Sequence, residues 1–408
     1  MAKTIALLIT LDTKAQEAEY LREQIQMRGF NALLFDIGVV GEPGTPPDID
    51  RGRIAEAGDS SLSEMLKNPT REAASPIVEK GCIRLLQELI EEDKVHAILG
   101  LGGTQGTTRC CNIMQAIPYG FPKIMVSTVA SGDTSPFVGI KDITMMFSVS
   151  DILKLNPFTR KILSNAAGAA CGMADTETIF DIQKGEKPLI GMTNLGVLTQ
   201  GTMHALKYLE EKEYEVIVFH AVGSGGRAME QMMREGIIGA VFDYAMGEIA
   251  DDVWSVLRAG GPERLTIAGK LGLPQVLCPG GAEHLGILVP PNEVPPAYKD
   301  HLHVFHSPVV FVPRLNADEI KRVADEICRR LQFTTNKAFF LIPTQGVGRY
   351  STPGNVLHDP VSDQAFFERL KECLPPNIEV VEMDTHAEDP AFVQAAIDNL
   401  IDLIENGN

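Results

Sequence analysis

The chain has little positive charge and no long apolar run. It carries 36 lysines and arginines against 54 aspartates and glutamates, which gives a formal net charge of -18 at pH 7. Nucleic acids and anionic membrane surfaces attract proteins through a positive field, so we expect neither as a partner. No apolar run reaches the roughly 18 residues of a membrane span, and the start MAKTIALLIT leads directly into an expected strand, which favours a soluble, cytoplasmic protein.

The cysteines lack the close spacing that is typical of a metal site. They are an odd number, seven, and they lie far apart except for one adjacent pair. We expect reduced and mostly buried thiols, which is the usual state of isolated cysteines. The seven positions are Cys82, Cys110, Cys111, Cys171, Cys278, Cys328 and Cys373.

The length and the apolar pattern predict two domains. With 408 residues the chain exceeds one ordinary domain. Short apolar runs alternate with helical periodicity, which predicts an α/β fold of two doubly wound, mostly parallel-sheet (Rossmann-like) domains with a cleft between them. We expect the domains at residues 1–184 and 185–408, with a linker at 184–187, one helix at 54–66, and further strands of the parallel sheet at 287–289 and 309–312. The spacing from 193 to 220 nearly repeats that from 10 to 36, which indicates a possible duplication.

A glycine-rich loop follows the apolar strand that begins the segment AILGLGGTQGTTRCCNI, residues 97–113. A strand, a glycine loop and a helix amino terminus together form a cradle for phosphate oxygens, so we predict a nucleotide site. The loop lacks the lysine of a Walker motif, and Lys14, Arg109 or a metal must therefore supply the positive charge. A plain tight turn is the alternative. The predicted cofactor-binding residues of the loop are Gly102, Gly103, Thr104, Gly106 and Thr107.

Other polar residues follow neighbouring strands of the same expected sheet. Lys14 is placed to reach a phosphate; the alternative is that Asp12 or Thr13 caps the helix and Lys14 is only solvated. Asp36 is placed to accept hydrogen bonds from ribose hydroxyls, and a simple turn role is its alternative. Asp133 is the predicted magnesium ligand within SGDTSP, a segment that is also ordinary turn chemistry. The loop after the first strand contributes Asp12, Thr13 and Lys14 to the predicted site, and the later segment contributes Ser127, Thr128, Ser131 and Gly132. No G-x-G-x-x-G motif is present at the first strand, so a standard NAD site is not expected.

The second half repeats the strand, glycine loop and helix in AVGSGGRAME, residues 221–230. This loop is a candidate site for a phosphate or carboxylate substrate. His220, His306 and Glu248 are candidates for general acid or base chemistry, or for a metal site, if the fold brings them together; structural roles are the alternative. His284 and His386 also fall in loops or beyond strands. The predicted substrate-binding residues are Gly223, Ser224, Gly225, Gly226 and Arg227.

Four segments, taken in order, resemble one known family. They are ITLDTK, LGLGGTQGTT, STVASGDTSPFVGIKDITMMFSVSDILKLN and VFHAVGSGGRAME. The chain resembles the Tm-one-like ATP-binding domain family, largely uncharacterised microbial proteins whose plant relatives include part of a tomato protein conferring resistance to tomato mosaic virus. The resemblance implies a two-domain α/β architecture, binding of ATP with Mg²⁺, and self-association into a homo-oligomer. It implies no settled reaction.

Together these features predict an ATP-binding protein that uses Mg-ATP with a small anionic ligand at the inter-domain cleft. If it is an enzyme, we expect an ATP-dependent ligase, kinase or hydrolase, with Lys14 and Arg227 neutralising charge and His220 or His306 as the base. Two alternatives stay open. One is a nucleotide-stabilised binding or oligomerisation module without catalysis, and the other is a nucleotide-independent enzyme that acts on a small acid or sugar acid through second-domain His and Glu residues.

Overall fold

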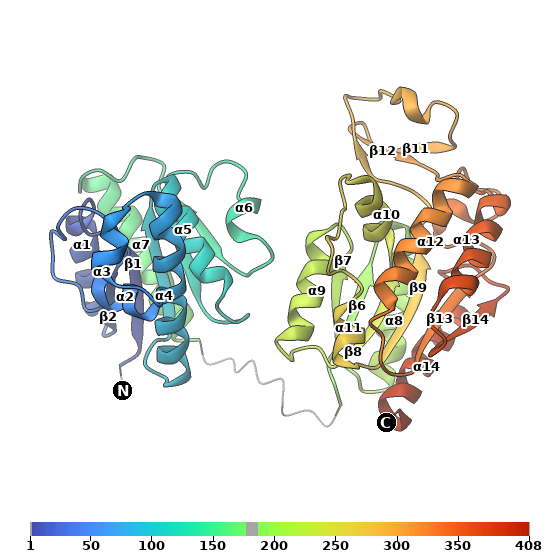
Figure 1. Ribbon diagram of the computed structural model, residues 1–408, viewed down its shortest axis with the longest axis horizontal. Coiled ribbons are helices and arrows are strands. Elements are labelled where there is room, and N and C mark those ends of the chain that lie inside the picture. Colours follow the sequence, from blue (N-terminus) through green and yellow to red (C-terminus); the bar gives the residue numbers. More distant parts are fainter. Residues whose placement is uncertain (1, 177–186, 408) are drawn as a thin grey trace. The chain divides into compact units, whose positions relative to one another are not determined.

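The computed structural model describes residues 2–176 and 187–407. The chain divides into two compact units, Met1–Phe180 and Asp181–Asn408, and each is described here by itself (Figure 1). The predicted linker and the boundary at 184/185 lie outside the described residues, apart from Lys187. Within the described ranges, no helix is both long enough and apolar enough to cross a bilayer.

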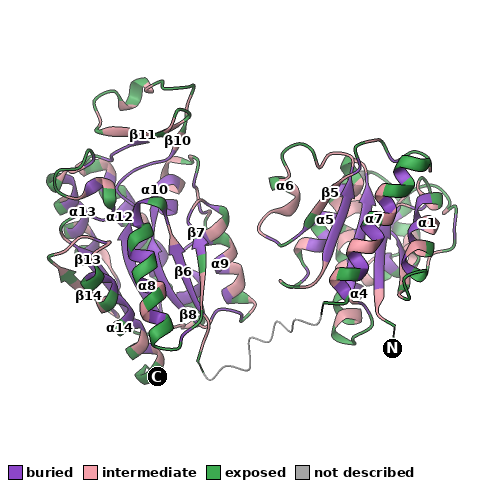
Figure 2. Ribbon diagram, turned by 180° about the vertical axis from the view of Figure 1, so that it is seen from behind, coloured by how far each residue is buried: buried purple, intermediate pink, exposed green. Residues whose placement is uncertain are grey.

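The first unit is a five-stranded parallel sheet with the order β2-β1-β3-β4-β5. Successive residues of a strand face opposite sides of the sheet, and both sides are covered. Ile5, Leu7 and Ile9 pack with α1 and α7, whereas Ala6 and Leu8 pack with α2, α4 and α5, so β1 is buried from Ile5 to Ile9. Figure 2 shows the buried interior of this sheet. The elements are β1 (Thr4–Ile9), α1 (Ala15–Gln26), β2 (Asn31–Asp36), α2 (Arg51–Ala57), α3 (Leu62–Lys67), α4 (Arg71–Glu91), β3 (Ala97–Gly102), α5 (Thr104–Gln115), β4 (Lys123–Ser127), α6 (Ser135–Val138), β5 (Thr144–Phe147) and α7 (Pro157–Ala174).

The second unit has a six-stranded parallel sheet with the order β14-β13-β9-β8-β6-β7. Helices α8 and α14 pack on one face, and α10, α12 and α13 on the other. The elements are β6 (Ile190–Asn194), η2 (Gly196–Leu198), α8 (Thr199–Glu211), β7 (Val216–His220), α9 (Ser224–Arg234), β8 (Ala240–Ala245), α10 (Gly247–Trp254), α11 (Ile267–Leu271), β9 (Gln275–Gly280), β10 (Ile287–Leu288), η3 (Pro296–Tyr298), β11 (His303–Ser307), β12 (Val310–Pro313), α12 (Ala317–Leu331), β13 (Ala338–Pro343), η4 (Arg349–Ser351), α13 (Pro360–Cys373), β14 (Ile378–Met383) and α14 (Pro390–Asn406).

Both sheets are wound in the same way. In each unit the first strand lies between the second and the third, so the winding reverses next to β1 in one sheet and next to β6 in the other. This confirms the predicted fold class of two mostly parallel, Rossmann-like sheets. In such sheets the loops after the carboxyl ends of the strands at this reversal form the usual ligand crevice.

Three predicted elements are wrong. The runs at 287–289 and 309–312 do not join the parallel sheet: β10 and β12 pair antiparallel, and β12 pairs with β11, which the sequence did not indicate. The helix predicted at 54–66 is two helices, because α2 ends at Gly58 and α3 starts only after the cap Ser61. A Cβ at Gly58 would collide with the carbonyl oxygen of Ile77 in α4, so the chain turns where α4 approaches most closely.

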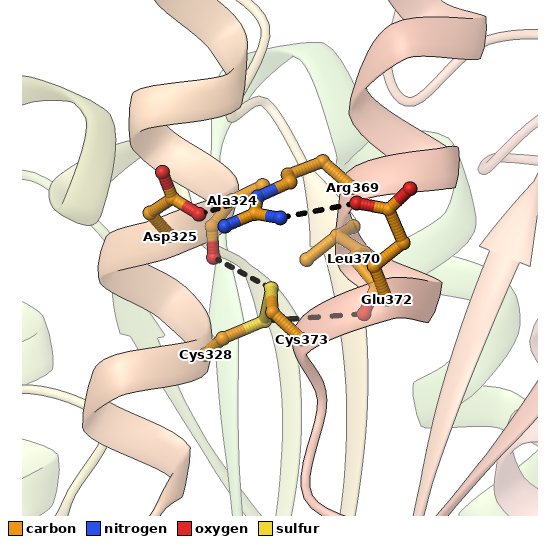
Figure 3. The surroundings of a disulfide bond; sticks show 7 residues. All are labelled: Ala324, Asp325, Cys328, Arg369, Leu370, Glu372 and Cys373. Atoms are coloured by element: carbon orange, nitrogen blue, oxygen red, sulfur yellow. Dashed lines mark hydrogen bonds and ion pairs between the residues drawn. A yellow bond between two sulfur atoms is a disulfide. The ribbon is translucent and has the colours of Figure 1, made fainter.

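The prediction of reduced cysteines fails for two of the seven. Cys328 and Cys373 form a disulfide that joins α12 to α13, beside the ion pair between Arg369 and Asp325 (Figure 3). The two cysteines are 45 residues apart, and no sequence pattern links them; the parallel packing of α12 and α13 brings their Cα atoms to 5.8 Å. The other five cysteines are free and buried, as expected.

Candidate functional site

A cavity of about 520 Å³ lies at the carboxyl-terminal edge of the sheet in the second unit. Its walls come from the loops after β6, β7, β9 and β13, and the small antiparallel sheet closes one side. It therefore occupies the position where parallel sheets usually bind ligands. The lining residues are Leu195, Gly196, Val197, His220, Val222, Leu257, Arg258, His284, Gly286, His306, Val310, Val312, Arg349 and Tyr350.

The lining combines basic and apolar side chains. Its ionisable groups, taken from the described residues, are three histidines, two arginines and one tyrosine, with no carboxylate among them. On a chain of net charge -18 this is an unusual local composition. Leucine and valine side chains form the remaining wall. Such a cavity suits a small molecule with an anionic group and an apolar part.

His220 and His306, which the sequence singled out, both line this cavity. His220 is the last residue of β7, and His306 lies in β11 at an irregularity between Phe305 and Ser307 that shifts the pairing with β12. A bulge of this kind redirects a side chain. Both histidines are exposed, so each is accessible to a ligand. Their catalytic roles stay predictions.

Arg258 is fixed in the cavity wall by a buried carboxylate. The carboxylate of Asp251 accepts three hydrogen bonds from Arg258: from Nε at 2.9 Å, from Nη2 at 2.8 Å and from the backbone N–H at 2.8 Å. Asp251 is fully buried, and it also accepts from the backbone N–H of Gly286 at 3.0 Å. Nη2 of Arg258 donates to the carbonyl oxygen of His284 at 2.8 Å. The guanidinium is therefore preorganised: because it is already held in place, little side-chain conformational entropy is lost when a ligand binds.

Arg349 enters the cavity from the loop after β13. Its Nε and Nη2 donate to the two oxygens of Glu388, each at 3.2 Å, and this pairing raises the pKa of the guanidinium. Glu388 also accepts from the backbone N–H of Gln200 at 2.8 Å, in the first turn of α8. Arg349 is about half exposed, so it is the more accessible of the two arginines.

Behind His284 lies a buried acidic residue, Glu283. His284 is 3% exposed and Glu283 is 0% exposed, so both are buried. Nδ1 of His284 lies 3.2 Å from Oε1 of Glu283. Burial alone would raise the pKa of Glu283, but interactions with His284 and Arg314 outweigh burial and lower it to about 2. Glu283 is therefore ionised at neutral pH.

Glu248, a predicted catalytic residue, does not line this cavity in the part of the chain that the structure describes. It is fully buried, and its Oε1 accepts from the backbone N–H of Gly223 at 2.6 Å and of Gly226 at 3.1 Å. Its Oε2 accepts from Nε of Arg264 at 2.6 Å. Glu248 thus places an internal carboxylate at the amino terminus of α9, where the sequence predicts an external anion.

The glycines of the second loop are explained by this internal contact. A Cβ at Gly226 would overlap Oε2 of Glu248, and one at Gly225 would overlap the carbonyl oxygen of His220. Gly223 has a φ of +90°. Ser224 and Arg227 are exposed, and Nε of Arg227 donates to the carbonyl oxygen of Gly223 at 3.2 Å.

The glycine loop of the first unit has a different environment. Helix α5 starts after Gly103, and no side chain caps it within the described residues. Close packing requires glycine at position 102, because a Cβ added there would lie 2.7 Å from Cα of Gly106. Gly103 is open, since a Cβ there would meet only Oγ1 of Thr128, at 3.8 Å. Thr104 is exposed and Gly106 is half-buried. The amino terminus of α5 is therefore sterically accessible to a phosphate.

Several predicted nucleotide contacts already have partners within the first unit. Thr107 and Ser127 are buried and hydrogen-bonded to each other at 2.7 Å. Asp36 is buried, pairs with Nε of Arg51 at 3.1 Å, and accepts from the backbone N–H of Gly38 at 3.0 Å. Lys14 donates to the carbonyl oxygen of Ile152 at 2.7 Å. Asp36 thus makes the turn contact that the sequence left open, whereas no side chain caps α1 among the described residues.

The remaining predicted residues are accessible. Asp12, Thr13, Ser131, Gly132 and Asp133 are exposed, and Thr128 is half-buried. Asp133 accepts from the backbone N–H of Ser135 at 2.9 Å, and hydrogen bonding by Ser135 lowers its pKa. In the described ranges no group of three His, Cys, Asp or Glu side chains is placed to hold a metal ion. A magnesium ion at Asp133 would need most of its ligands from water and phosphate.

Both halves of the chain match one family. Residues 3–178 match the N-terminal domain, and residues 187–404 the C-terminal domain, of the uncharacterised protein family UPF0261. The chain belongs to this family.

Members of UPF0261 align along nearly the whole chain. The UPF0261 protein of Clostridium tetani is 38% identical over 406 residues, which are 99% of this chain and 100% of that protein. The ToMV resistance protein Tm-1 of Solanum lycopersicum is 28% identical over 418 residues, covering 97% of this chain and 55% of that protein, which confirms the predicted resemblance. The structure of a putative UDP-N-acetylglucosamine 2-epimerase from Listeria monocytogenes covers 68% of this chain and 79% of its own, at 13% identity and a TM-score of 0.23.

Sequence reasoning on this UPF0261 member missed Arg258, Glu283 and Tyr350. Arg258 lies in an unremarkable loop, and its partner Asp251 precedes it by seven residues on a helix. Glu283 belongs to no sequence motif, and only its complete burial in the structure distinguishes it from the other glutamates. The loop after β13 brings Arg349 into the cavity wall.

Proposed function

We propose that the second unit binds a small organic anion with an apolar part in the cavity between β7 and the antiparallel sheet. One observation carries the proposal: the ionisable side chains that line the cavity, as far as the structure describes them, are histidine, arginine and tyrosine, without a carboxylate. Arg349 and Arg258 would hold the anionic group, and Val197, Val222 and Val310 the apolar part.

We further propose that His220 and His306 exchange protons with this ligand. They approach the cavity from two different elements, and histidine changes its charge near neutral pH, as a general acid or base requires. The proposal favours a nucleotide-independent enzyme that acts on a small acid, which is one of the alternatives that the sequence left open.

Thermal unfolding of the full chain tests the binding. A panel of small carboxylates and phosphate esters should include members that raise the melting temperature, because a ligand of the native state stabilises it. R349M should reduce this shift, whereas R227M, which changes an exposed arginine outside the cavity lining, should leave it intact. If no panel member stabilises the wild type, the proposal fails.

Catalysis is tested separately, once a stabilising acid is known. H220A and H306A should bind it but lose roughly 100-fold or more in turnover, because general acid-base catalysis supplies factors of this size. Both side chains are exposed, so the variants should fold normally. Unchanged turnover in both variants would remove these histidines from the mechanism.

A second proposal concerns the first unit, where a nucleotide phosphate would bind the amino terminus of α5. It is favoured by the open approach at Gly103 and by the absence of a side-chain cap in the described structure. Gly103, Thr104, Gly106 and Thr128 would contact the phosphate, with Asp12 and Asp133 near the magnesium ion. ATP, Mg²⁺ and self-association stay predictions from the resemblance. Stabilisation by millimolar ATP, with and without Mg²⁺, tests them, and no shift would contradict nucleotide binding.

A further inference from the structure

Both arginines of the cavity wall are already paired with carboxylates that stand outside the lining. Asp251, which is fully buried, holds Nε and Nη2 of Arg258 at 2.9 and 2.8 Å. Glu388, whose side chain is 9% exposed, holds Nε and Nη2 of Arg349, each at 3.2 Å. Neither acid is part of the lining that the structure describes, so a ligand meets the arginines first. Each positive charge is nevertheless balanced at hydrogen-bonding distance.

The charged groups behind His284 add no net positive charge. Glu283 is ionised, because its pKa is lowered to about 2. Arg314 has a carboxylate partner of its own, since its Nη2 donates to Asp363 at 2.6 Å. The pKa of Asp363 is about 6, so this partner is ionised at pH 8. As far as the structure describes these groups, the acids at pH 8 at least balance the arginines.

The two arginines still keep N–H groups for a ligand. A guanidinium has five N–H groups. Glu388 takes two of those of Arg349 and leaves three, and Nη1 has no partner among the described residues. Asp251 takes two of those of Arg258, and the carbonyl oxygen and Nε2 of His284 take two more, which leaves one. The cavity can therefore donate hydrogen bonds to an anion without offering an unbalanced positive charge.

We infer that the cavity selects organic monoanions such as carboxylates and rejects dianions such as phosphate monoesters, because Asp251 and Glu388 already neutralise its two arginines. The inference deepens the proposed function and rests on it for binding. A monoanion brings one charge, which several N–H donors share. A dianion brings a second charge into a partly desolvated site near two carboxylates, and like charges placed together oppose binding strongly.

Three probes with the same branched alkyl group test the preference on the full chain. Isocaproate is a planar monoanion, isopentyl sulfonate a tetrahedral monoanion, and isopentyl phosphate a tetrahedral anion that is doubly charged at pH 8. Calorimetric titration at pH 8, where histidine side chains are largely neutral, should show isocaproate binding roughly tenfold or more tightly than the phosphate. The sulfonate should also bind more tightly than the phosphate.

Two results would overturn the inference in the wild type. One is that isopentyl phosphate binds as tightly as isocaproate, or that isocaproate does not bind. The other is that the sulfonate is as weak as the phosphate, because the shape of the anionic group and not its charge would then decide.

E388Q tests where the preference comes from. The variant keeps the side-chain size and an oxygen that accepts from Arg349, but it removes the charge. It should strengthen the binding of isopentyl phosphate several-fold relative to isocaproate. E379Q, which removes an exposed carboxylate that pairs with Lys337, should leave the preference unchanged. No change in E388Q, or the same change in E379Q, would overturn the role of Glu388.

The remaining outcomes separate this inference from the proposed function. Thermal melting checks that E388Q folds, and the three probes on the wild type decide the charge preference if it does not. If phosphate esters of the panel bind and carboxylates do not, the cavity holds an anion and only the charge preference is wrong. If no member of the panel binds, the proposed function fails and the inference fails with it.

Discussion

Oε1 of Glu248 lies 2.6 Å from the backbone nitrogen of Gly223, so an internal carboxylate occupies the helix terminus that the sequence offers to an external anion. Helix amino termini attract anions of any origin. The two glycine loops of this chain look alike in sequence, yet one holds Glu248 and the other, at α5, has no side-chain cap among the described residues. Loop similarity alone therefore does not identify a binding site.

Glu248 should matter for stability. E248Q removes a charge that is buried against Arg264, and breaking such a pair typically costs on the order of 3 kcal/mol. Urea unfolding should show this loss, while E210Q, at an exposed position on α8, should change little. A stable E248Q variant that has lost ligand binding would instead place Glu248 in the site chemistry.

The two glycines before α5 should respond differently to substitution. G103V places its side chain in open space, so we expect a normal melting temperature and loss of any stabilisation by ATP. G102A should lower stability by about 1–3 kcal/mol, because its Cβ meets the backbone of Gly106. Melting curves with and without ATP separate the two effects. ATP stabilisation that persists in G103V would mean that the nucleotide binds elsewhere.

Periodicity and turn residues sufficed to predict the parallel sheets, because buried strands and amphipathic helices have strong local signals. The small antiparallel sheet was missed, since β11 (HVFHS) mixes polar and apolar residues and is only partly buried. His220 and His306 were named as candidates, but only the fold brings them to one cavity. Arg258 and Glu283 could not be found, because complementary charges meet through tertiary contacts that leave no motif.

Asp363 should make stability depend on pH. Burial, only partly offset by Arg314, raises its pKa from 3.8 to about 6 in the folded chain. Between pH 4 and 6 the folded state thus binds more protons than the unfolded state, so the contribution of Asp363 is present below pH 4 and is lost as pH rises through 6. The free energy of unfolding of wild type relative to D363N should fall by roughly 3 kcal/mol between pH 4 and 7. A constant or rising difference would contradict the raised pKa.

The disulfide should contribute measurably to stability. Closing a loop of 45 residues restricts the unfolded chain by about 4 kcal/mol in the entropic model. Reduction, or the C328S/C373S double variant, should lower the free energy of unfolding by that order. Thiol titration of the denatured, unreduced protein should find the five free cysteines. Seven titratable thiols would show that the bond is absent.

Calorimetric titration with the most stabilising acid of the panel tests the central claim most directly. V310W, which fills the cavity from the antiparallel sheet, should abolish binding, whereas R227M, beside the glycine loop of α9, should bind as the wild type does. Thermal melting confirms that both variants fold. Binding that survives V310W but is lost in R227M would contradict the account and return the site to the glycine loop.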